Sequence, residues 1–539
     1  MKKMKKAASL FLVLLMMLSM YACGNNTETP SGTISSDIAS PGDSSSPTVS
    51  IEQPSQSAPV SDEDSKYGGI LRIVLTAEGA APLGLPWGNV SVDGLLQRPF
   101  LEALFYQMTV TGEIMPHIAT SWELNESESE LIIKLTPGVL FHDGTTLTAE
   151  VAGWNIMKHV EAHTANALII GYEARDDETL VLKYESWSHE ILSSLSTVAM
   201  CSKDAYEKNG EDWIMENPVG TGPFIMTEYI RGSVLRGKRN PNYWQEGKPY
   251  LDGIELIFLR DEMSQSMAIQ TDGPDGIDCL NTNTAELAAE LMTKNLLRYT
   301  VNAGPVTMFP SSNNPDSPLS KLEVRQAISY ALNREAIVAA RGFGIFTPAT
   351  QFAPEGHPAR LPDSYNVSYD LERAKALLAQ AGYPDGFSTT LYTQPGSTDR
   401  ELAVIIQSML AEIGITAAVE YPDSGGFAAM RSGGWEGFLV MATRLFPRIT
   451  SSYYSYFDAN NLFMTSVQRP EGWAQALDYA RTTPDIEQAA ITECHRFIME
   501  NLMLIPIMDG VGNLFTKPNV HDTNMFYDER MNWVDAWFS

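Results

Sequence analysis

The sequence predicts an α/β protein whose folded part divides into two or more lobes. Amphipathic helical stretches alternate with short apolar, strand-like runs along most of the chain, a pattern typical of α/β proteins. Residues 67–539 are too many for one hydrophobic core, so at least two cores are expected. After the first 22 residues, no segment reaches the roughly 20 unbroken apolar residues of a membrane-spanning helix.

The first 22 residues have the pattern of a signal peptide. Four lysines within residues 1–6 precede an uncharged apolar run, Ala7–Met20, that is too short to cross a bilayer comfortably. The run leads into residues 20–24, whose sequence MYACG resembles the lipobox of bacterial lipoproteins. We therefore expect Cys23 to be acylated and to anchor the chain in a membrane. The alternative is an ordinary signal peptide that Cys23 follows by chance.

Residues 23–66 are predicted to form a disordered tether beyond the leader of residues 1–22. Beyond Cys23 they are mostly Ser, Thr, Pro, Asp and Glu, and such a segment cannot bury enough apolar surface to offset the entropy of ordering. A long tether of this kind after a lipid anchor favours the outer face of a Gram-positive cell membrane. The folded part is expected to start at Tyr67, just before the strand-like run of residues 68–75.

Several patterns in the first half of the chain indicate short strands and a capped helix. Two apolar runs between Trp122 and Leu135 flank an acidic turn, and a Thr-Pro-Gly sequence ends the second run. Thr148 can cap a helix, and Glu150 stands in its first turn, where the helix dipole favours an acid. We therefore expect two strands followed by a helix that begins after Thr148.

The second half predicts helix-to-strand crossovers. Apolar residues recur at helical spacing over residues 374–381, and Gly382 is placed to end that helix. A second periodic run over residues 402–413 stops at Gly414, and residues 415–419 then alternate as a strand. Repeated crossovers of this kind support the α/β class.

The chain is strongly acidic, with a formal charge of −29. Removal of residues 1–22, which carry four lysines and no acidic residue, makes the charge −33. Such a surface disfavours nucleic acid or anionic lipid as a partner.

Three cysteines lie beyond Cys23, far apart and without CxxC spacing, which disfavours a metal cluster or a disulfide scaffold. One long-range disulfide among Cys201, Cys279 and Cys494 remains open.

The sequence carries no recognisable catalytic motif. The GxSxG, Walker A and HExxH patterns are absent. His159 and His163 could share a helical face and bind a metal, but Glu161 lies on another face, so a solvated helical surface is the simpler interpretation. Residues 220–223, Gly-Thr-Gly-Pro, lack the features of a dinucleotide loop and predict a tight reversal. We expect a binding protein without a cofactor, with a secreted hydrolase or adhesin as the less favoured class.

Six groups of motifs follow the order found in one protein family. They are Pro116–Trp122; Phe141–Thr145 before Thr148–Val151; Asn217–Phe224; Arg239–Trp244 with Gly247–Asp252; Val324–Ile328 with Ala331–Arg334; and Tyr369–Asp370 through Ala381–Phe387. Each motif alone is weakly specific, but the ordered set covers most of the chain. It resembles family 5 of the bacterial extracellular solute-binding proteins, which includes oligopeptide-, dipeptide- and nickel-binding proteins.

The resemblance implies a periplasmic-binding-protein type II fold, in which two α/β lobes close about a hinge on a ligand in the cleft between them. Lobe one would be residues 67–301, with an inserted subdomain at about residues 95–215. Lobe two would be residues 302–506, and residues 507–539 would return to lobe one. The implied function is the capture of a peptide-class small solute by a monomer, which delivers it to the permease subunits of an ABC importer.

The same resemblance makes lobe two decisive for the ligand. Peptide binders of the family hold the peptide's amino group with an Asp, and the corresponding stretch here begins at Trp435. Leu445 stands where the Asp is expected, between Arg444 and Arg448, although a shifted alignment would give that role to Asp458. Two arginines would suit a carboxylate or an anionic chelate of nickel or cobalt. Either arginine could instead face solvent or pair with surface acids.

Aromatic residues are the remaining candidates for the cleft. Trp87 lies in a Gly- and Pro-rich loop near the place of a ligand-facing loop in the family, and Trp435 opens the lobe-two stretch. Tyr453 and Tyr454 follow the arginines, and such rings line pockets that admit varied side chains. The alternative for each of them is a place in the hydrophobic core.

Overall fold

The computed structural model describes residues 66–75, 83–88, 96–109, 111–394, 400–458, 464–483, 488–525 and 531–539. The predicted leader, the lipidation site Cys23 and the tether up to residue 65 lie outside these residues. Within the described ranges, no helix is both long and apolar enough to cross a membrane.

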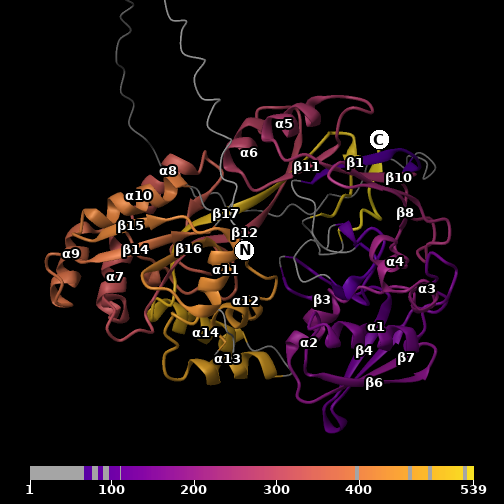
Figure 1. Ribbon diagram of the computed structural model, residues 1–539, viewed down its shortest axis with the longest axis horizontal. Helices are drawn as coiled ribbons and strands as arrows, with labels where there is room; N and C mark the ends of the chain where they lie inside the picture. The colour runs from indigo at the N-terminus through magenta and orange to yellow at the C-terminus, as the bar shows by residue number, and fades with distance from the viewer. Residues whose placement is uncertain are drawn as a thin grey trace, which may run out of the picture. The chain divides into compact units, whose positions relative to one another are not determined.

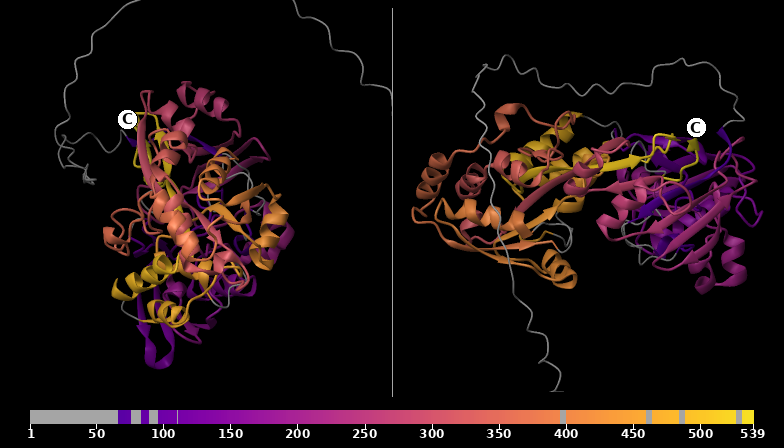
Figure 2. Two further views of the ribbon diagram at one scale, coloured as in Figure 1. Left: turned by 90° about the vertical axis from the view of Figure 1, so that its left-hand side faces the viewer. Right: turned by 90° about the horizontal axis from the view of Figure 1, so that it is seen from above.

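One mixed sheet extends through the described part of the chain (Figure 1). Its strands are, in order, β15 (Thr416–Glu420), β14 (Ser388–Thr393), β16 (Phe438–Ala442), β12 (Leu297–Pro310), β17 (Ile505–Thr516), β11 (Cys279–Thr282), β1 (Ile70–Leu75), β10 (Gly253–Phe258), β9 (Val234–Arg239) and β8 (Phe224–Ile230), with the short β13 (Thr347–Pro348) beside β17. The long strands β12 and β17 are antiparallel and pair from Leu297 opposite Thr516 to Met308 opposite Ile505, with two register shifts between Asn302 and Thr307. They are the two strands shared by both halves of the sheet (Figure 2).

Residues between 306 and 508, in the region of the predicted lobe two, form two hydrophobic cores. The first core is covered by α7 (Leu322–Ala331), α8 (Arg334–Arg341), α9 (Leu371–Gln380) and α10 (Arg400–Ala411). The second is built with α11 (Ser424–Gly433), α12 (Ile449–Phe457), α13 (Trp473–Thr482) and α14 (Gln488–Glu500). Strand β14 is parallel to both β15 and β16, as the helix-to-strand crossovers require.

Lobe one contains the other half of the sheet, in which β1 is parallel to β10 and β11. One core lies against α3 (Lys203–Asn209) and α4 (Glu211–Glu216), and another against α5 (Glu262–Gln270) and α6 (Ala285–Leu291). The C-terminal segment, with β18 (Val520–His521) and β19 (Trp537–Phe538), contributes Trp533 and Ala536 to the first of these cores. The expected crossing points near residues 302 and 506 fall within β12 and β17.

A separate antiparallel sheet forms a subdomain of lobe one. Its strand order is β4 (Ala119–Asn125), β5 (Glu130–Leu135), β7 (Thr179–Tyr184) and β6 (Ile169–Asp176), next to the hairpin of β2 (Phe105–Gln107) and β3 (Ile114–Pro116). Every second residue of β5 from Leu131 onward is buried, in a core shared with α1 (Ala149–Glu161) and α2 (His189–Leu195). The subdomain therefore has its own core, to which α2 contributes Ile191, Leu192 and Leu195.

The structure confirms the predicted helix cap, helix ends and chain reversal, which depend on neighbouring backbone groups. The Thr148 side chain accepts a hydrogen bond from the Val151 amide and caps α1. Gly382 and Gly414 follow α9 and α10 with positive φ, which a glycine adopts without strain. The tight reversal before Phe224 leads into β8, as expected. The predicted α/β class is confirmed.

The expectation of a solvated histidine face is wrong. Helix α1 ends at Glu161, and His163 has a φ of +58°, so the two histidines do not share a helical face. His159 is buried, with Nδ1 2.8 Å from the Thr164 hydroxyl and Nε2 3.1 Å from the Ala199 carbonyl oxygen. Burial lowers the pKa of His159 to about 4, so it is a neutral core residue.

The three described cysteines carry free thiols. Cys201, Cys279 and Cys494 are all buried, and burial raises the pKa of each thiol above its usual value. Cys201 and Cys279 belong to a core of lobe one and Cys494 to a core of lobe two. The long-range disulfide that the sequence left open is therefore not formed.

Candidate functional site

The carboxyl ends of two parallel strands define one edge of lobe two. Strands β14 and β16 are paired from Leu391 opposite Phe438 to Thr393 opposite Val440, so both end at this edge. In open α/β sheets, ligands bind outside the carboxyl ends of the strands. Gln394 lies there, with its amide donating to the Val440 carbonyl and its side-chain oxygen buried without a hydrogen-bond partner. The segment that follows β16 lies at the same edge.

Hydrogen bonds hold the segment after β16 in place. The Thr443 hydroxyl and amide both donate to the Pro305 carbonyl of β12, at 2.5 and 2.9 Å. The Arg444 amide donates to the Tyr456 hydroxyl at 2.9 Å, and the Phe446 amide donates to a serine hydroxyl of α12 at 2.8 Å. The segment is thus fixed between a strand shared by both lobes and the helix that begins after Arg448.

Arg448 is the cation of this segment that makes no ion pair within the described residues, although the charge of Glu190 acts on it. It is half-buried directly before α12, and its Nε atom is buried without a hydrogen-bond partner. No ion pair or hydrogen bond links its guanidinium to any residue in the described ranges. Burial lowers the pKa of Arg448, and the negative charge of Glu190 in lobe one opposes this change only in part. A partly desolvated cation of this kind is stabilised by an anion.

Lobe one approaches this segment through the turn of the β2–β3 hairpin. Gly112 lies in the turn with a φ of +70°, and its amide donates to the Met108 carbonyl. A Cβ atom at Gly112 would lie 2.6 Å from the Pro447 carbonyl oxygen and 3.1 Å from the Arg448 amide nitrogen. The two lobes are therefore in main-chain contact beside Arg448.

A small cavity lies in lobe one between this hairpin and Ser196, which follows α2. It is lined by Arg98, Leu101, Glu102, Ala103, Phe105, Tyr106, His117, Ser196 and Asn532. The elements that supply Phe105 and Ser196, the hairpin and α2, are also the elements of lobe one that reach lobe two. The cavity is thus flanked by the parts of lobe one that contact the segment carrying Arg448.

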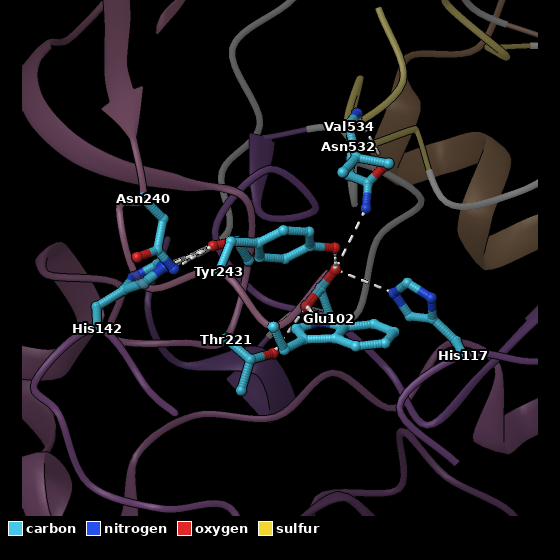
Figure 3. A network of polar contacts seen from close by, with 10 residues as sticks. Glu102, His117, His142, Thr221, Asn240, Tyr243, Asn532 and Val534 are labelled. Atoms are coloured by element: carbon cyan, nitrogen blue, oxygen red, sulfur yellow. Dashed lines mark hydrogen bonds and ion pairs between the residues drawn. The ribbon is translucent and has the colours of Figure 1, made fainter. Parts of the chain in front are cut away.

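The base of the cavity is a buried carboxylate, Glu102, that accepts hydrogen bonds from distant parts of the chain (Figure 3). Its donors are His117 Nε2 at 3.0 Å, Thr221 Oγ1 at 3.0 Å, the Tyr243 hydroxyl at 2.7 Å, Trp244 Nε1 at 3.0 Å and Asn532 Nδ2 at 3.3 Å. Burial alone would raise the pKa of Glu102, but the charge and hydrogen bond of His117 and the other donors hold it below its usual value. This ionised carboxylate joins the subdomain, the main sheet and the C-terminal segment of lobe one.

The structure places three of the predicted aromatic ligand residues in cores. Trp87 is 8% exposed and packs edge-on against Trp154 and Tyr206. Trp435 is buried and donates from Nε1 to the Phe309 carbonyl at 3.3 Å, and Tyr453 is fully buried in the same core of lobe two. The burial favours the alternative of a core role for these three side chains.

Arg444 and Tyr454 lie nearer the surface, and their contact with a ligand stays a prediction. Arg444 is exposed, and its guanidinium lies 4.8 Å from the centre of the Phe446 ring. Tyr454 is 38% exposed beneath the guanidinium of Arg481, which is 3.7 Å from its ring centre. Asp458, the alternative partner for an amino group, follows α12 and attracts Arg469.

Sequence reasoning missed the residues by which lobe one meets lobe two. Glu190 and Gly112 of lobe one, and Ser451 and Arg481 of lobe two, belong to no motif and show no regular spacing. They come from separate elements that only the fold brings together. The Arg448 segment alone could be found, because a family motif leads into it.

Comparisons with known proteins agree with the fold. The model of the family "Bacterial extracellular solute-binding proteins, family 5 Middle" matches residues 113–463. The glutathione-binding protein GsiB of Salmonella typhi is 31% identical over 351 residues, which are 63% of this chain and 67% of that protein. GsiB of Shigella flexneri is 30% identical over 353 residues, with the same coverage.

Solved structures match over almost their full length. AgaA of Agrobacterium tumefaciens R10, in complex with agropinic acid, is 25% identical, with a TM-score of 0.70 over 87% of this chain and 99% of that one. DppA of Helicobacter pylori, in complex with the peptide STSA, is 20% identical, with a TM-score of 0.72 over 88% and 99%. These neighbours have the two-lobed periplasmic-binding-protein type II fold, so the predicted fold is confirmed.

Family 5 solute-binding proteins are extracytoplasmic, bind small ligands or peptides and work with the permeases of ABC importers. The matched residues span both lobes, from the β2–β3 hairpin to the end of the segment that carries Arg448 and α12. On these grounds, the chain belongs to family 5 of the bacterial extracellular solute-binding proteins.

Proposed function

We propose that this protein captures a small peptide-class solute through a carboxylate of that solute and delivers it, as a monomer, to the permease subunits of an ABC importer. The observation that carries the proposal is Arg448, a half-buried guanidinium whose Nε atom has no hydrogen-bond partner, beside the contact between the lobes. A carboxylate matches a guanidinium in charge and can accept two parallel hydrogen bonds from it.

The position that would hold a peptide's amino group supports recognition of an acid. Leu445, where peptide binders of the family have an Asp, is an apolar residue packed against a core of lobe two. A desolvated ammonium group needs a nearby anion, and this segment offers two arginines in its place. The segment therefore offers cations to the ligand's negative end, and at Leu445 it lacks the Asp that would hold an amino group.

The ligands named for two similar proteins are of the same chemical kind. GsiB is described as a glutathione-binding protein, and AgaA was solved with agropinic acid. Both compounds carry carboxylates, and glutathione is also a small peptide. An anionic chelate of nickel or cobalt, or another small anionic metabolite, offers the same charge to Arg448 and is the alternative that the experiment must exclude.

Binding of purified protein to a panel of ligands tests this proposal. Isothermal titration would compare glutathione, short peptides with a free or an amidated C-terminus, and nickel and cobalt chelates. We expect the free carboxylate to be required and Arg448→Ala to weaken binding by roughly tenfold to a hundredfold, the effect of losing a hydrogen-bonded charge pair. Arg448→Lys should recover only part of the loss, because lysine cannot form the bidentate contact.

Arg231→Ala is the matched control, since Arg231 is an exposed arginine of lobe one that pairs with Glu216. It should bind like the unaltered protein. Equal affinity for free and amidated peptides, or full affinity in Arg448→Ala, would contradict the proposal. Binding of the metal chelates alone would favour the alternative ligand class.

The same proposal includes an anchor at Cys23, a residue outside the described ranges. Acylation there would hold the receptor at the outer face of the cell membrane, within reach of its permease. Cys23→Ser should move the protein from the membrane fraction to the soluble fraction, and an unchanged distribution would exclude the anchor.

A further inference from the structure

Helix α2 of lobe one presents a carboxylate to two helices of lobe two. Ser188 caps the helix, and Glu190 stands in its first turn. The Ser451 hydroxyl of α12 reaches both carboxylate oxygens of Glu190, at 3.1 and 2.9 Å. Arg481, in the last turn of α13, has its Nε atom 3.9 Å from Glu190 Oε1. The Arg481 and Glu190 side chains are only 13% and 14% exposed, so this contact excludes most of the surrounding water.

The neighbouring residue of α2 reinforces the contact. His189 Nε2 donates a hydrogen bond at 2.5 Å to the carbonyl oxygen of Thr483, the residue that follows α13. Arg481 in turn lies over the ring of Tyr454, which fixes its guanidinium against α12. The start of α2 is therefore held at two consecutive residues, Glu190 and His189, by groups of the other lobe. Figure 1 shows α2 next to α13.

The hydrogen bonds and ion pairs of the Glu190 side chain in the described part of the chain all come from lobe two. Ser451 donates to it, Arg481 pairs with it, and Arg448 is attracted to it. No cation or hydroxyl of lobe one shares this carboxylate within the described ranges. These interactions can exist only while the two lobes are closed on one another, and opening returns each group to water.

We propose that the start of α2 is an interlobe latch, in which Glu190 is captured by Ser451 and Arg481 and biases the ligand-free protein toward the closed form. A contact that exists only in the closed form stabilises that form, relative to the open form, by the full free energy of the contact. Apparent ligand affinity varies with the fraction of protein in the competent form, so the latch also sets affinity without touching the ligand.

Glu190 has a second effect that separates it from Arg481. Its charge acts on Arg448, and a ligand carboxylate would compete with it for that arginine. Glu190→Gln therefore removes the latch, which lowers ligand affinity. It also removes an anion that competes with the ligand for Arg448, which raises ligand affinity. Arg481→Gln breaks the latch and leaves the Glu190 charge in place, so it reports on closure alone.

The experiment measures closure in the complete, ligand-free protein. Hydrogen exchange of the amides in α2 and α13, together with small-angle scattering, would compare Arg481→Gln, Glu190→Gln and the unaltered protein. We expect both variants to exchange roughly tenfold faster in these two helices and to have a larger radius of gyration, because each loses the largely buried ion pair between the lobes. Ser451→Ala removes only a hydroxyl and should produce the same change to a smaller degree.

Glu493→Gln is the matched control, because Glu493 pairs with Arg496 within α14 and this pair does not cross between the lobes. It should leave exchange in α2 and α13 unchanged. Unaltered exchange and scattering in Arg481→Gln and Glu190→Gln would overturn the latch. A general rise in exchange across both cores would mean loss of folding and would also overturn it, unless Ser451→Ala shows the local change. Because no ligand is present, failure of the latch is distinguishable from failure of carboxylate recognition.

Discussion

Two carboxylates of lobe one, Glu102 and Glu190, are both withdrawn from water but are satisfied in opposite ways. Glu102 takes all its donors from lobe one and the C-terminal segment packed on it. Glu190 takes its partners from the other lobe. Separation of the lobes leaves the first carboxylate as it is and returns the second to water. A carboxylate withdrawn from water can thus stabilise the fold in one place and, where its partners belong to the other lobe, influence the balance between open and closed forms.

The two lobes also meet near α6 and α8, and this second contact differs from the one at Glu190. There Arg341 of α8 pairs with Glu286 of α6 at 3.4 Å and with Glu401 of α10 at 2.8 Å. Beside it, Ile345 is buried in the core of lobe one with Phe515 of β17. Exposing packed apolar side chains to water costs free energy, whereas charged groups that separate are hydrated at little net cost. We expect this side to stay joined when the α2 side opens.

Among these predictions, the largest change in the free energy of unfolding is expected for a substitution of Glu102. Glu102→Gln leaves several buried donors facing an amide, and breaking a buried charged network of this kind costs about 3–5 kcal/mol. Urea unfolding of the ligand-free protein should show this loss, while Glu161→Gln, which alters an exposed pair with Lys158, should change stability little. A loss below about 1 kcal/mol would show that the network contributes little to folding.

The Glu102 effect should also depend on pH in a defined direction. Its pKa is lowered in the folded protein, so its contribution is fully present above the unfolded value of about 4.3. The contribution is lost as pH falls through the lower, folded pKa. The difference in stability between Glu102→Gln and the unaltered protein should therefore be constant near neutral pH and shrink in acid. A difference that is independent of pH would assign the loss to packing instead of charge.

An intermediate effect is expected at Ile345. Ile345→Ala removes buried methyl groups from a core that contains residues of both lobes, at a cost of about 2–4 kcal/mol. The variant should unfold at lower urea concentration, yet its α2 and α13 amides should exchange like those of the unaltered protein under native conditions. Selective opening at α2 in this variant would contradict the proposed division between the two contacts.

The smallest effect is expected at Glu286, whose side chain is half exposed. Glu286→Gln should change the free energy of unfolding by less than about 1 kcal/mol, because exposed ion pairs contribute little. It should also leave ligand-free scattering unchanged, in contrast to Glu190→Gln, although both carboxylates pair with an arginine of the other lobe. Equal opening in the two variants would show that position relative to the hinge does not matter.

The parts of the molecule that sequence could predict are those decided locally or by an ordered set of motifs. The cap at Thr148 and the glycines at 382 and 414 depend on neighbouring backbone groups, and the two-lobed fold followed from the family motifs. His159 was misjudged because its helix ends two residues later and the core then closes over it. No spacing in the sequence separates an aromatic core residue such as Tyr453 from a cleft residue.

The site was predictable only in part for the same reason. Arg448 lies in a short segment that a family motif marks, so its charge could be noticed beside Leu445. Its lack of a partner depends on what lies across from it in lobe one, which is fixed by tertiary contacts. Glu190 and Arg481 are far apart in the chain and resemble ordinary surface charges until the lobes meet.

The contact at Gly112 has a consequence for how the protein closes. Main-chain atoms of the hairpin turn and of Pro447 lie against one another with no space for even a methyl group. A layer of water molecules cannot fit between these two backbone segments. The segments are therefore either in direct contact without water or separated and hydrated. Closure of the lobes beside Arg448 therefore requires that water leave the surfaces of both backbones.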